Sequence, residues 1–206
     1  MRINSPYKNV FYYYRGPSNK EIGNNRQIED NVTKALINTL ENSSVSLLCC
    51  FLGICGIKLY EVVSPRYSLQ ISKEHSRPDA RIQIKNHKDI YIEVKTSSDL
   101  DKDQIERHLN AIGKDYLLCI TGNQKDSIKL DEFKTERLKY ISWQSIYSEL
   151  VKYQKSKKGE PIENFLLSHF ILLLEEINMC TFTGWKKGDF EAFGVCQDSC
   201  RLTPLI

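Results

Sequence analysis

The stretch "RPDARIQIKNHKDIYIEVK", residues 77–95, alternates polar and apolar residues on both sides of a polar turn. Alternation with a period of two is typical of β-strands that bury one face, and "KNHKD" is rich in turn-forming residues. The sequence therefore predicts two antiparallel strands, at 80–85 and 89–95, joined as a hairpin. The hairpin begins after "RPD" and ends in "EVK", so ionisable residues gather at both of its ends.

Strand geometry brings these ionisable residues together. Side chains two apart in a strand point to the same face, so Glu93 and Lys95 are neighbours. A hairpin that turns around residues 86–87 places Asp79 opposite about residue 94. Two carboxylates at close range repel each other unless a cation lies between them or one of them is protonated. Carboxylate oxygens suit a hard cation such as Mg²⁺, and a neighbouring lysine can activate a water molecule; the alternative is an amphipathic hairpin whose charges lie on a solvated face.

Periodicity along the rest of the chain predicts an α/β core, with a central mixed sheet between helices. Apolar residues at steps of three and four, or apolar runs, indicate helices at 26–42, 45–60, 101–112, 142–154 and 164–179. We expect further strands at 115–121 and 136–143. Residues 60–69 are expected to be an extended entry that Pro65 interrupts. Ser142 is expected to cap the helix that follows it.

Length and composition fit one substantial domain with small appendages. The chain has 206 residues, of which 41% are hydrophobic, so it can form a core. We expect an N-terminal lead-in at 1–25, a core at 26–155 and a helical C-terminal extension at 156–206. No apolar run is long enough for a membrane span and the N-terminus lacks the apolar region of a signal peptide, so a cytoplasmic protein is expected. The net charge of +3 permits nucleic-acid binding without demanding it.

The seven cysteines do not have the spacing of a disulfide framework. An odd count, with several thiols inside apolar runs, is typical of free cysteines in a reducing compartment. Cys196 and Cys200 have a separation that metal ligands use, and Cys180 and His169 are further candidates for a zinc site. Plain thiols are the interpretation that the sequence favours.

The hairpin and its neighbours resemble a known family. "PD" at 78–79, followed by "EVK" at 93–95, resembles the motif of the PD-(D/E)xK nuclease superfamily in its PD…ExK form. Glu29 is similar to the acidic residue of the family's first core helix. "QIERH" at 104–108 is similar to the Q-x-x-x-Y element of the RecB-like branch, with histidine in place of tyrosine. The likeness covers about residues 26–147.

The resemblance implies a restriction endonuclease-like core, in which helices flank a four-stranded mixed sheet, with one additional C-terminal helix in this chain. It also implies Mg²⁺-dependent hydrolysis of DNA phosphodiester bonds, with Mn²⁺ as a substitute. The implied metal ligands are Asp79, Glu93, Glu29 and the carbonyl group of Val94. Lys95 would activate the attacking water, Glu29 would assist it, and Gln104 would help to position the substrate.

Basic residues and an apolar helix suggest partners. Lys73, Arg77 and Arg81 lie close to the motif, where they suit an incoming phosphate backbone, although an ordinary solvated surface explains them equally well. "FLLSHFILLL", residues 165–174, is apolar on more than one face. It predicts either core packing or a surface for a homo-oligomer or a partner subunit.

Three interpretations of function stay open. The first is a DNA endonuclease that acts in restriction, antiviral defence or DNA processing. The second is a catalytically inactive module of the same fold that binds nucleic acid or a protein partner. The third is a nuclease module that acts on RNA or within a larger defence complex. The intact Asp79, Glu93 and Lys95 favour an active enzyme over an inactive module.

Overall fold

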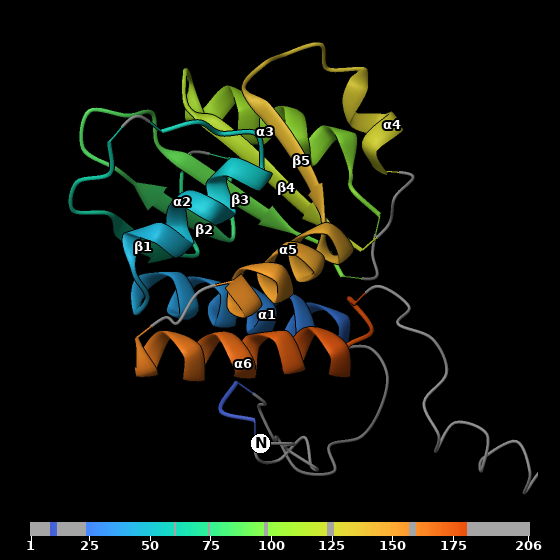
Figure 1. Cartoon of the computed structure of the whole chain (residues 1–206). Coiled ribbons are helices and arrows are strands. Elements are labelled where there is room, and N and C mark those ends of the chain that lie inside the picture. The colour runs from blue at the N-terminus through green and yellow to red at the C-terminus, as the bar shows by residue number, and fades with distance from the viewer. Residues whose placement is uncertain are drawn as a thin grey trace, which may run out of the picture.

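The centre of the protein is a five-stranded sheet in the order β1-β2-β3-β4-β5, with helices on both faces (Figure 1). The structure is a computed structural model that describes residues 9–11, 24–59, 61–73, 75–96, 99–122, 126–156 and 160–180. The strands are β1 (Arg66–Leu69), β2 (Ala80–Gln83), β3 (Ile90–Val94), β4 (Tyr116–Thr121) and β5 (Leu138–Ser142). The first three pair antiparallel and the last three pair parallel. The expected α/β class with a mixed sheet is thus confirmed.

β1 is a strand that was not predicted, and it makes the sheet five-stranded where four strands were expected. We expected Pro65 to break an extended segment, but Pro65 directly precedes β1. β1 lies at the edge of the sheet and pairs with β2 alone. A proline just before an edge strand removes no hydrogen bond from the ladder, so it does not prevent pairing.

The β2–β3 hairpin has a register that differs by one residue from the expected one. Ala80 pairs with Ile92, so Asp79 falls opposite Glu93 instead of the residue after it. The hairpin is centred on Asn86, whose φ of 65 lies in the left-handed region that asparagine tolerates. Directly opposed residues of an antiparallel pair point to the same face. The observed register therefore places the two carboxylates on one face of the sheet.

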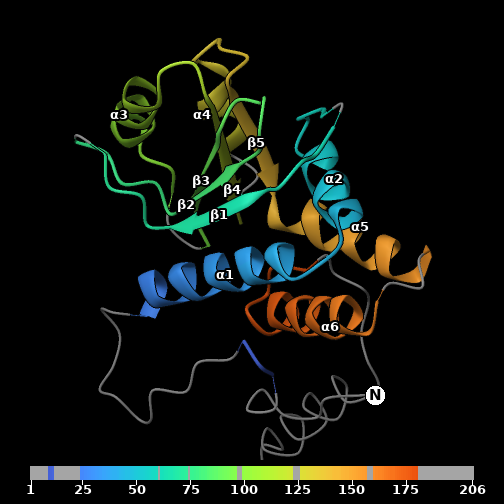
Figure 2. The same ribbon diagram turned by 90° about the vertical axis from the view of Figure 1, so that its left-hand side faces the viewer.

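Helices cover both faces of the sheet (Figures 1 and 2). One face packs against α1 (Asn24–Glu41), α2 (Val45–Ile54) and α5 (Trp143–Ser156), and α6 (Pro161–Glu176) packs on α1 and α5. The other face packs against α3 (Lys102–Ile112) and the short, unpredicted α4 (Asp126–Asp131). Ser142 caps α5 as predicted, because its Oγ accepts the N–H of Ser145 at 3.2 Å. Of the helices described, none has the length and apolar character needed to cross a membrane.

β3 is buried along its whole length because both of its faces are covered. Ile90, Ile92 and Val94 pack toward the α1 side of the sheet. Tyr91 packs toward α3 on the other side. Glu93 alternates in the same way as Tyr91, so its carboxylate faces α3 inside the core. A continuous apolar strand of this kind is typical of central strands, and the single carboxylate within it needs an explanation.

α6 packs within its own chain. Leu167, Phe170 and Leu174 are fully buried, in the same cluster as the apolar residues of α1 and α5. Figure 2 shows α6 lying along α1, on the side away from the sheet. Ile162 and Phe165 are exposed, at 66% and 51%. The apolar run of the C-terminal extension is therefore mostly core, and a partner surface there would rest on these two side chains.

Candidate active site

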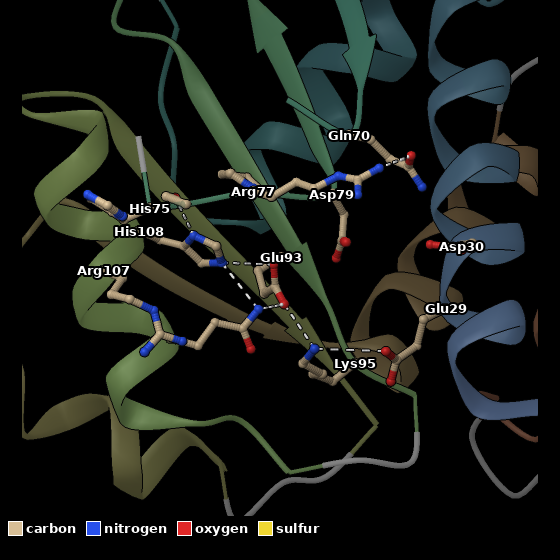
Figure 3. Close-up of a pocket in the computed structure, with 13 residues that line it drawn as sticks. Glu29, Asp30, Gln70, His75, Arg77, Asp79, Glu93, Lys95, Arg107 and His108 are labelled. Atoms are coloured by element: carbon tan, nitrogen blue, oxygen red, sulfur yellow. Dashed lines mark hydrogen bonds and ion pairs between the residues drawn. The ribbon is translucent and has the colours of Figure 1, made fainter. Parts of the chain in front are cut away.

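The start of β2 and the end of β3 bring the predicted carboxylates together, and in Figure 3 the side chains converge on one point. Asp79 directly precedes β2, and its N–H donates to the Ile92 carbonyl at 3.0 Å. Its Oδ2 accepts the Val94 N–H at 2.8 Å. The Asp79 side chain is thus held against the end of β3 by a main-chain donor, beside Glu93.

Glu93 is a buried carboxylate, 1% exposed, that accepts hydrogen bonds from three side chains. Its Oε1 accepts from Lys95 Nζ at 2.9 Å and from Gln104 Nε2 at 2.7 Å. Its Oε2 lies 3.1 Å from His108 Nε2. Hydrogen bonds to an ionised acceptor offset the cost of burying its charge. Glu93 is therefore fixed by a lysine of its own strand and by two residues that lie one turn apart on α3.

α1 brings Glu29 to the same place. Glu29 Oε2 lies 3.8 Å from Lys95 Nζ, and Glu29 Oε1 accepts the Thr96 N–H at 3.1 Å. The main chain of Lys95 is held from the other side. Its N–H donates to the Ile120 carbonyl at 2.8 Å, and its carbonyl accepts from Trp143 Nε1 at 3.2 Å. The Lys95 ammonium thus lies between the carboxylates of a strand and a helix.

The surroundings separate the pKa values of these groups. Burial and the charge of Glu93 raise the pKa of Asp79 from 3.8 to about 7. Burial acts on Glu93 too, but the hydrogen bond with His108 and the charge of Lys95 outweigh it and lower the Glu93 pKa. Burial by itself would lower the pKa of Lys95, but the negative charges of Glu93, Glu29 and Asp79 outweigh it and raise that pKa. Near neutral pH the site therefore holds an ionised Glu93–Lys95 pair beside an Asp79 that exchanges its proton.

The oxygen atoms of the site fit a hard divalent cation. Asp79 and Glu93 offer carboxylates, which Mg²⁺ prefers. The N–H of Lys95 donates to Ile120 of β4 and its C=O accepts from Gly122, so both groups face β4. The peptide groups of successive residues in a strand point to opposite sides, so the C=O of Val94 is directed to the other side, toward Asp79. Within the described ranges, no three His, Cys, Asp or Glu side chains are grouped so that they could hold a metal ion as they stand. The Lys95 ammonium itself lies beside the Glu93 carboxylate, 2.9 Å from its Oε1.

All five predicted catalytic residues line one cavity of about 560 Å³. They come from α1, from the start of β2, from β3 and its end, and from α3, and they are Glu29, Asp79, Glu93, Lys95 and Gln104. A molecule bound in this cavity would contact these residues.

The residues predicted to bind nucleic acid lie in different places. Arg77 lines the cavity, as does Gln104. Arg81 is not part of its lining: its guanidinium lies 3.8 Å from Asp89 and 5.9 Å from the centre of the Tyr91 ring. Lys73 lies over the same ring, with its Nζ 4.6 Å from the centre, outside the catalytic cavity.

A second cavity, of about 580 Å³, adjoins the first. It lies between α3 and the connection of β1 to β2, residues 70–79, which we call the arm. Its lining is formed by Lys73, His75, Arg107, Asn110 and Ala111. Two of these, His75 and Arg107, also line the catalytic cavity. None of these five lining residues is acidic, so the second cavity favours an anion.

Sequence reasoning did not assign Ser76 or Arg107 to the site. Ser76 Oγ lies 2.7 Å from His108 Nδ1. His108 stood out only as a departure from the Q-x-x-x-Y pattern. Its separation of four residues from Gln104 is the signal that places both on one face of α3. Ser76 carried no signal except that it lies three residues before Asp79.

No protein-family model, curated protein or solved structure matches this chain. The case for any activity rests on the side chains themselves.

Two of the zinc candidates, Cys196 and Cys200, lie outside the described residues. Most of the lead-in at 1–25 lies outside them as well. Of the two further zinc candidates, His169 uses its Nδ1 to accept the Val10 N–H at 3.3 Å, and Cys180 is a half-buried free thiol. The zinc site stays a prediction.

Proposed function

We propose that this protein is a metal-dependent nuclease of the PD-(D/E)xK class that hydrolyses phosphodiester bonds of DNA. The observation that carries the proposal is that two carboxylates and a lysine of the hairpin converge with Glu29 of α1 in one open cavity. In this proposal β1 to β4, between α1 and α3, form the restriction endonuclease-like core, and β5 is an addition. The order and pairing of these strands support it.

The proposed roles follow from the contacts. Asp79, Glu93 and the Val94 carbonyl would hold Mg²⁺ or Mn²⁺, which when bound would polarise the phosphate and lower the pKa of a water molecule. The Lys95 ammonium, once its contact with Glu93 is replaced, would orient the attacking water and offset charge on a phosphate oxygen. Glu29, fixed by the Thr96 N–H, would keep the ammonium at the mouth of the cavity.

The surroundings of the site support a nucleic acid as the substrate. Arg77 and Arg107 line the catalytic cavity, and Lys73 lines the cavity beside it. All three come from the arm or from α3, so cationic groups gather on one side of the carboxylates. A phosphodiester backbone that crosses this side would contact several cations in succession, which is the usual basis of sequence-independent binding.

A catalytically inactive binding module is the second candidate, and one observation favours it. Glu93 is satisfied by three protein donors, so the buried carboxylate is stable without a metal ion. Such a module would bind DNA through the same cationic side and would leave it intact.

Incubation of the purified full chain with linear, supercoiled, nicked and branched DNA, and with RNA, separates the two candidates. We expect cleavage of DNA in Mg²⁺ or Mn²⁺ and none in EDTA. Asp79→Asn, Glu93→Gln and Lys95→Gln should each reduce the rate by about 10²–10⁴-fold. Binding of DNA without any metal-dependent cleavage would support the inactive module.

Glu149→Gln is the matched control, because Glu149 does not line the catalytic cavity and forms an ion pair with the exposed Lys152. This variant should cleave at the wild-type rate. Metal-dependent cleavage that survives all three substitutions in the cavity would show that the activity belongs to another site or to a contaminant.

A further inference from the structure

His108 links two parts of the site that the sequence keeps far apart. It lies on α3 and is 2% exposed. Its Nε2 is 3.1 Å from Glu93 Oε2, and its Nδ1 is 2.7 Å from Ser76 Oγ. The imidazole thus bridges a carboxylate of β3 and a hydroxyl of the arm.

The arm carries the other proposed metal ligand. It is a narrow hairpin, in which the Gln70 N–H donates to the Asp79 carbonyl at 2.6 Å and the Lys73 N–H donates to the Ser76 carbonyl at 2.8 Å. Ser76 therefore lies on the strand of the arm that leads directly into Asp79. Ser76 is itself buried, at 8% exposed, so its hydroxyl needs a partner.

Hydrogen-bond chemistry assigns the direction of each bond. Glu93 accepts from Lys95 and Gln104 through its other oxygen, so it acts as an acceptor toward His108 as well. His108 Nε2 must then carry a proton. In a neutral ring Nδ1 is an acceptor, and the Ser76 hydroxyl donates to it. The Gln104 amide nitrogen, 3.3 Å from Nε2, is a second donor aimed at Glu93 and not a partner of the ring.

We propose that Ser76 and His108 are a pair of positioning residues, which hold the Glu93 carboxylate in place through Oε2 while Oε1 exchanges its contact with Lys95 for the metal ion. This inference rests on the proposed nuclease function. Because the same pair ties the arm to α3, it also sets the position of Asp79 relative to Glu93. A tyrosine at position 108, as in the family that the motif resembles, has one polar atom, whereas the two nitrogens of an imidazole join partners on opposite sides of the ring.

Binding of Mn²⁺ without nucleic acid tests the pair. Calorimetric titration of the EDTA-treated full chain should show a wild-type site that His108→Phe weakens by about 10- to 100-fold. His108→Gln, whose amide can reach the position of Nε2, should recover most of that affinity. His108→Asn reaches only the position of Nδ1 and should not. Ser76→Ala should weaken binding by about 10-fold, since the ring then loses its anchor.

A second readout does not involve metal. Nitrogen NMR of the His108 ring in the EDTA-treated protein should show a proton on Nε2, and Ser76→Ala should change the Nδ1 signal. A ring protonated at Nδ1 alone would overturn the assignment. His87→Gln, in the exposed β2–β3 turn, is the control and should alter neither readout.

The outcomes distinguish a failure of the proposed Ser76–His108 pair from a failure of the proposed nuclease function. If the wild type binds Mn²⁺ and cleaves DNA but folded His108→Phe and Ser76→Ala bind Mn²⁺ as tightly, the pair is not a positioning device and the nuclease stands. If the wild type binds no Mn²⁺, the proposed function fails and the inference fails with it. Thermal unfolding of each variant shows whether a loss of affinity is a loss of fold.

Discussion

Asp79 and Glu93 are buried in the same cavity, but the pKa of Asp79 is raised and the pKa of Glu93 is lowered, because their partners differ. Glu93 accepts from three side chains, one of them a lysine, so it stays ionised inside the core. Asp79 accepts from the main-chain N–H of Val94, and the neighbouring negative charge of Glu93 repels that of Asp79. Sequence patterns could pair the two carboxylates, but they could not show which one shares a proton, since that depends on donors from α3.

The raised pKa of Asp79 makes stability depend on pH. Between pH 3.8 and about 7 the folded protein holds a proton on Asp79 that the unfolded chain has lost. The stabilisation from this proton is present below pH 3.8 and is lost as the pH rises toward 7. Urea unfolding in EDTA should therefore show a wild-type stability that falls over this range relative to Asp79→Asn. A constant difference between the two proteins from pH 4 to 8 would contradict the prediction.

Lys95 should contribute to stability as well as to chemistry. Lys95→Met leaves Glu93 buried without its cation, and we expect the free energy of unfolding to fall by about 3 kcal/mol. Lys102→Met removes an exposed ammonium that pairs with Glu132, and it should cost less than about 1 kcal/mol. Urea denaturation of both variants at pH 7 measures the difference. Equal losses would mean that the Glu93–Lys95 pair is not specially buried.

Three elements meet at the site, and each was predictable to a different degree. The hairpin and α3 have clear periodicity, so the places of Glu93, Gln104 and His108 followed from spacing. The arm could not be predicted from the sequence, because the length and the turn residues of the connection between β1 and β2 do not indicate a hairpin. For that reason Ser76 was missed. The one-residue difference in register arose from the turn at Asn86, whose left-handed conformation local propensity does not dictate.

Gly122, just after β4, is required by close packing at the end of the sheet. A Cβ at this position would lie 2.5 Å from the Thr96 carbonyl oxygen, which is main chain and cannot rotate away. Gly122→Ala should therefore cost about 1–3 kcal/mol in unfolding free energy and displace Thr96, whose N–H holds Glu29. Urea unfolding and Mn²⁺ titration measure the two effects.

Gly53→Ala is the matched control for this substitution. Gly53 lies within α2, and a Cβ there would meet no atom within 4 Å. Alanine in place of glycine in the last turn of this helix should stabilise the protein by up to about 1 kcal/mol. Opposite signs for the two substitutions are the expected result, and a loss at Gly53 as large as at Gly122 would refute the packing argument.

Across the whole molecule, α6 connects the far side of the core to the site. Phe170 packs edge-on against Trp143, with ring centres 6.4 Å apart, and Trp143 donates to the Lys95 carbonyl. Periodicity predicted an apolar helix here but not its partner, because a helix that is apolar on several faces fits a core and an interface equally well. The predicted oligomer stays a prediction that would rest on Ile162 and Phe165.

Two phenylalanines of α6 give a matched test of this packing. Phe170 is fully buried, so Phe170→Ala should lower the free energy of unfolding by about 3–5 kcal/mol. Phe165 is 51% exposed, and Phe165→Ala should change it by about 0.5 kcal/mol at most if α6 has no partner. Sedimentation of wild type and Phe165→Ala shows whether this side chain supports an oligomer. Equal losses of stability would place Phe165 in an interface.

The bond from the Trp143 indole to the main chain of Lys95 also supplies an optical probe. The chain has two tryptophans, so Trp185→Phe leaves Trp143 as the single source of indole fluorescence. Trp143 is fully buried and should emit at short wavelength. A change in that emission on addition of Mn²⁺ or DNA would report a movement of the lysine's own backbone, without a label or a chemical reaction.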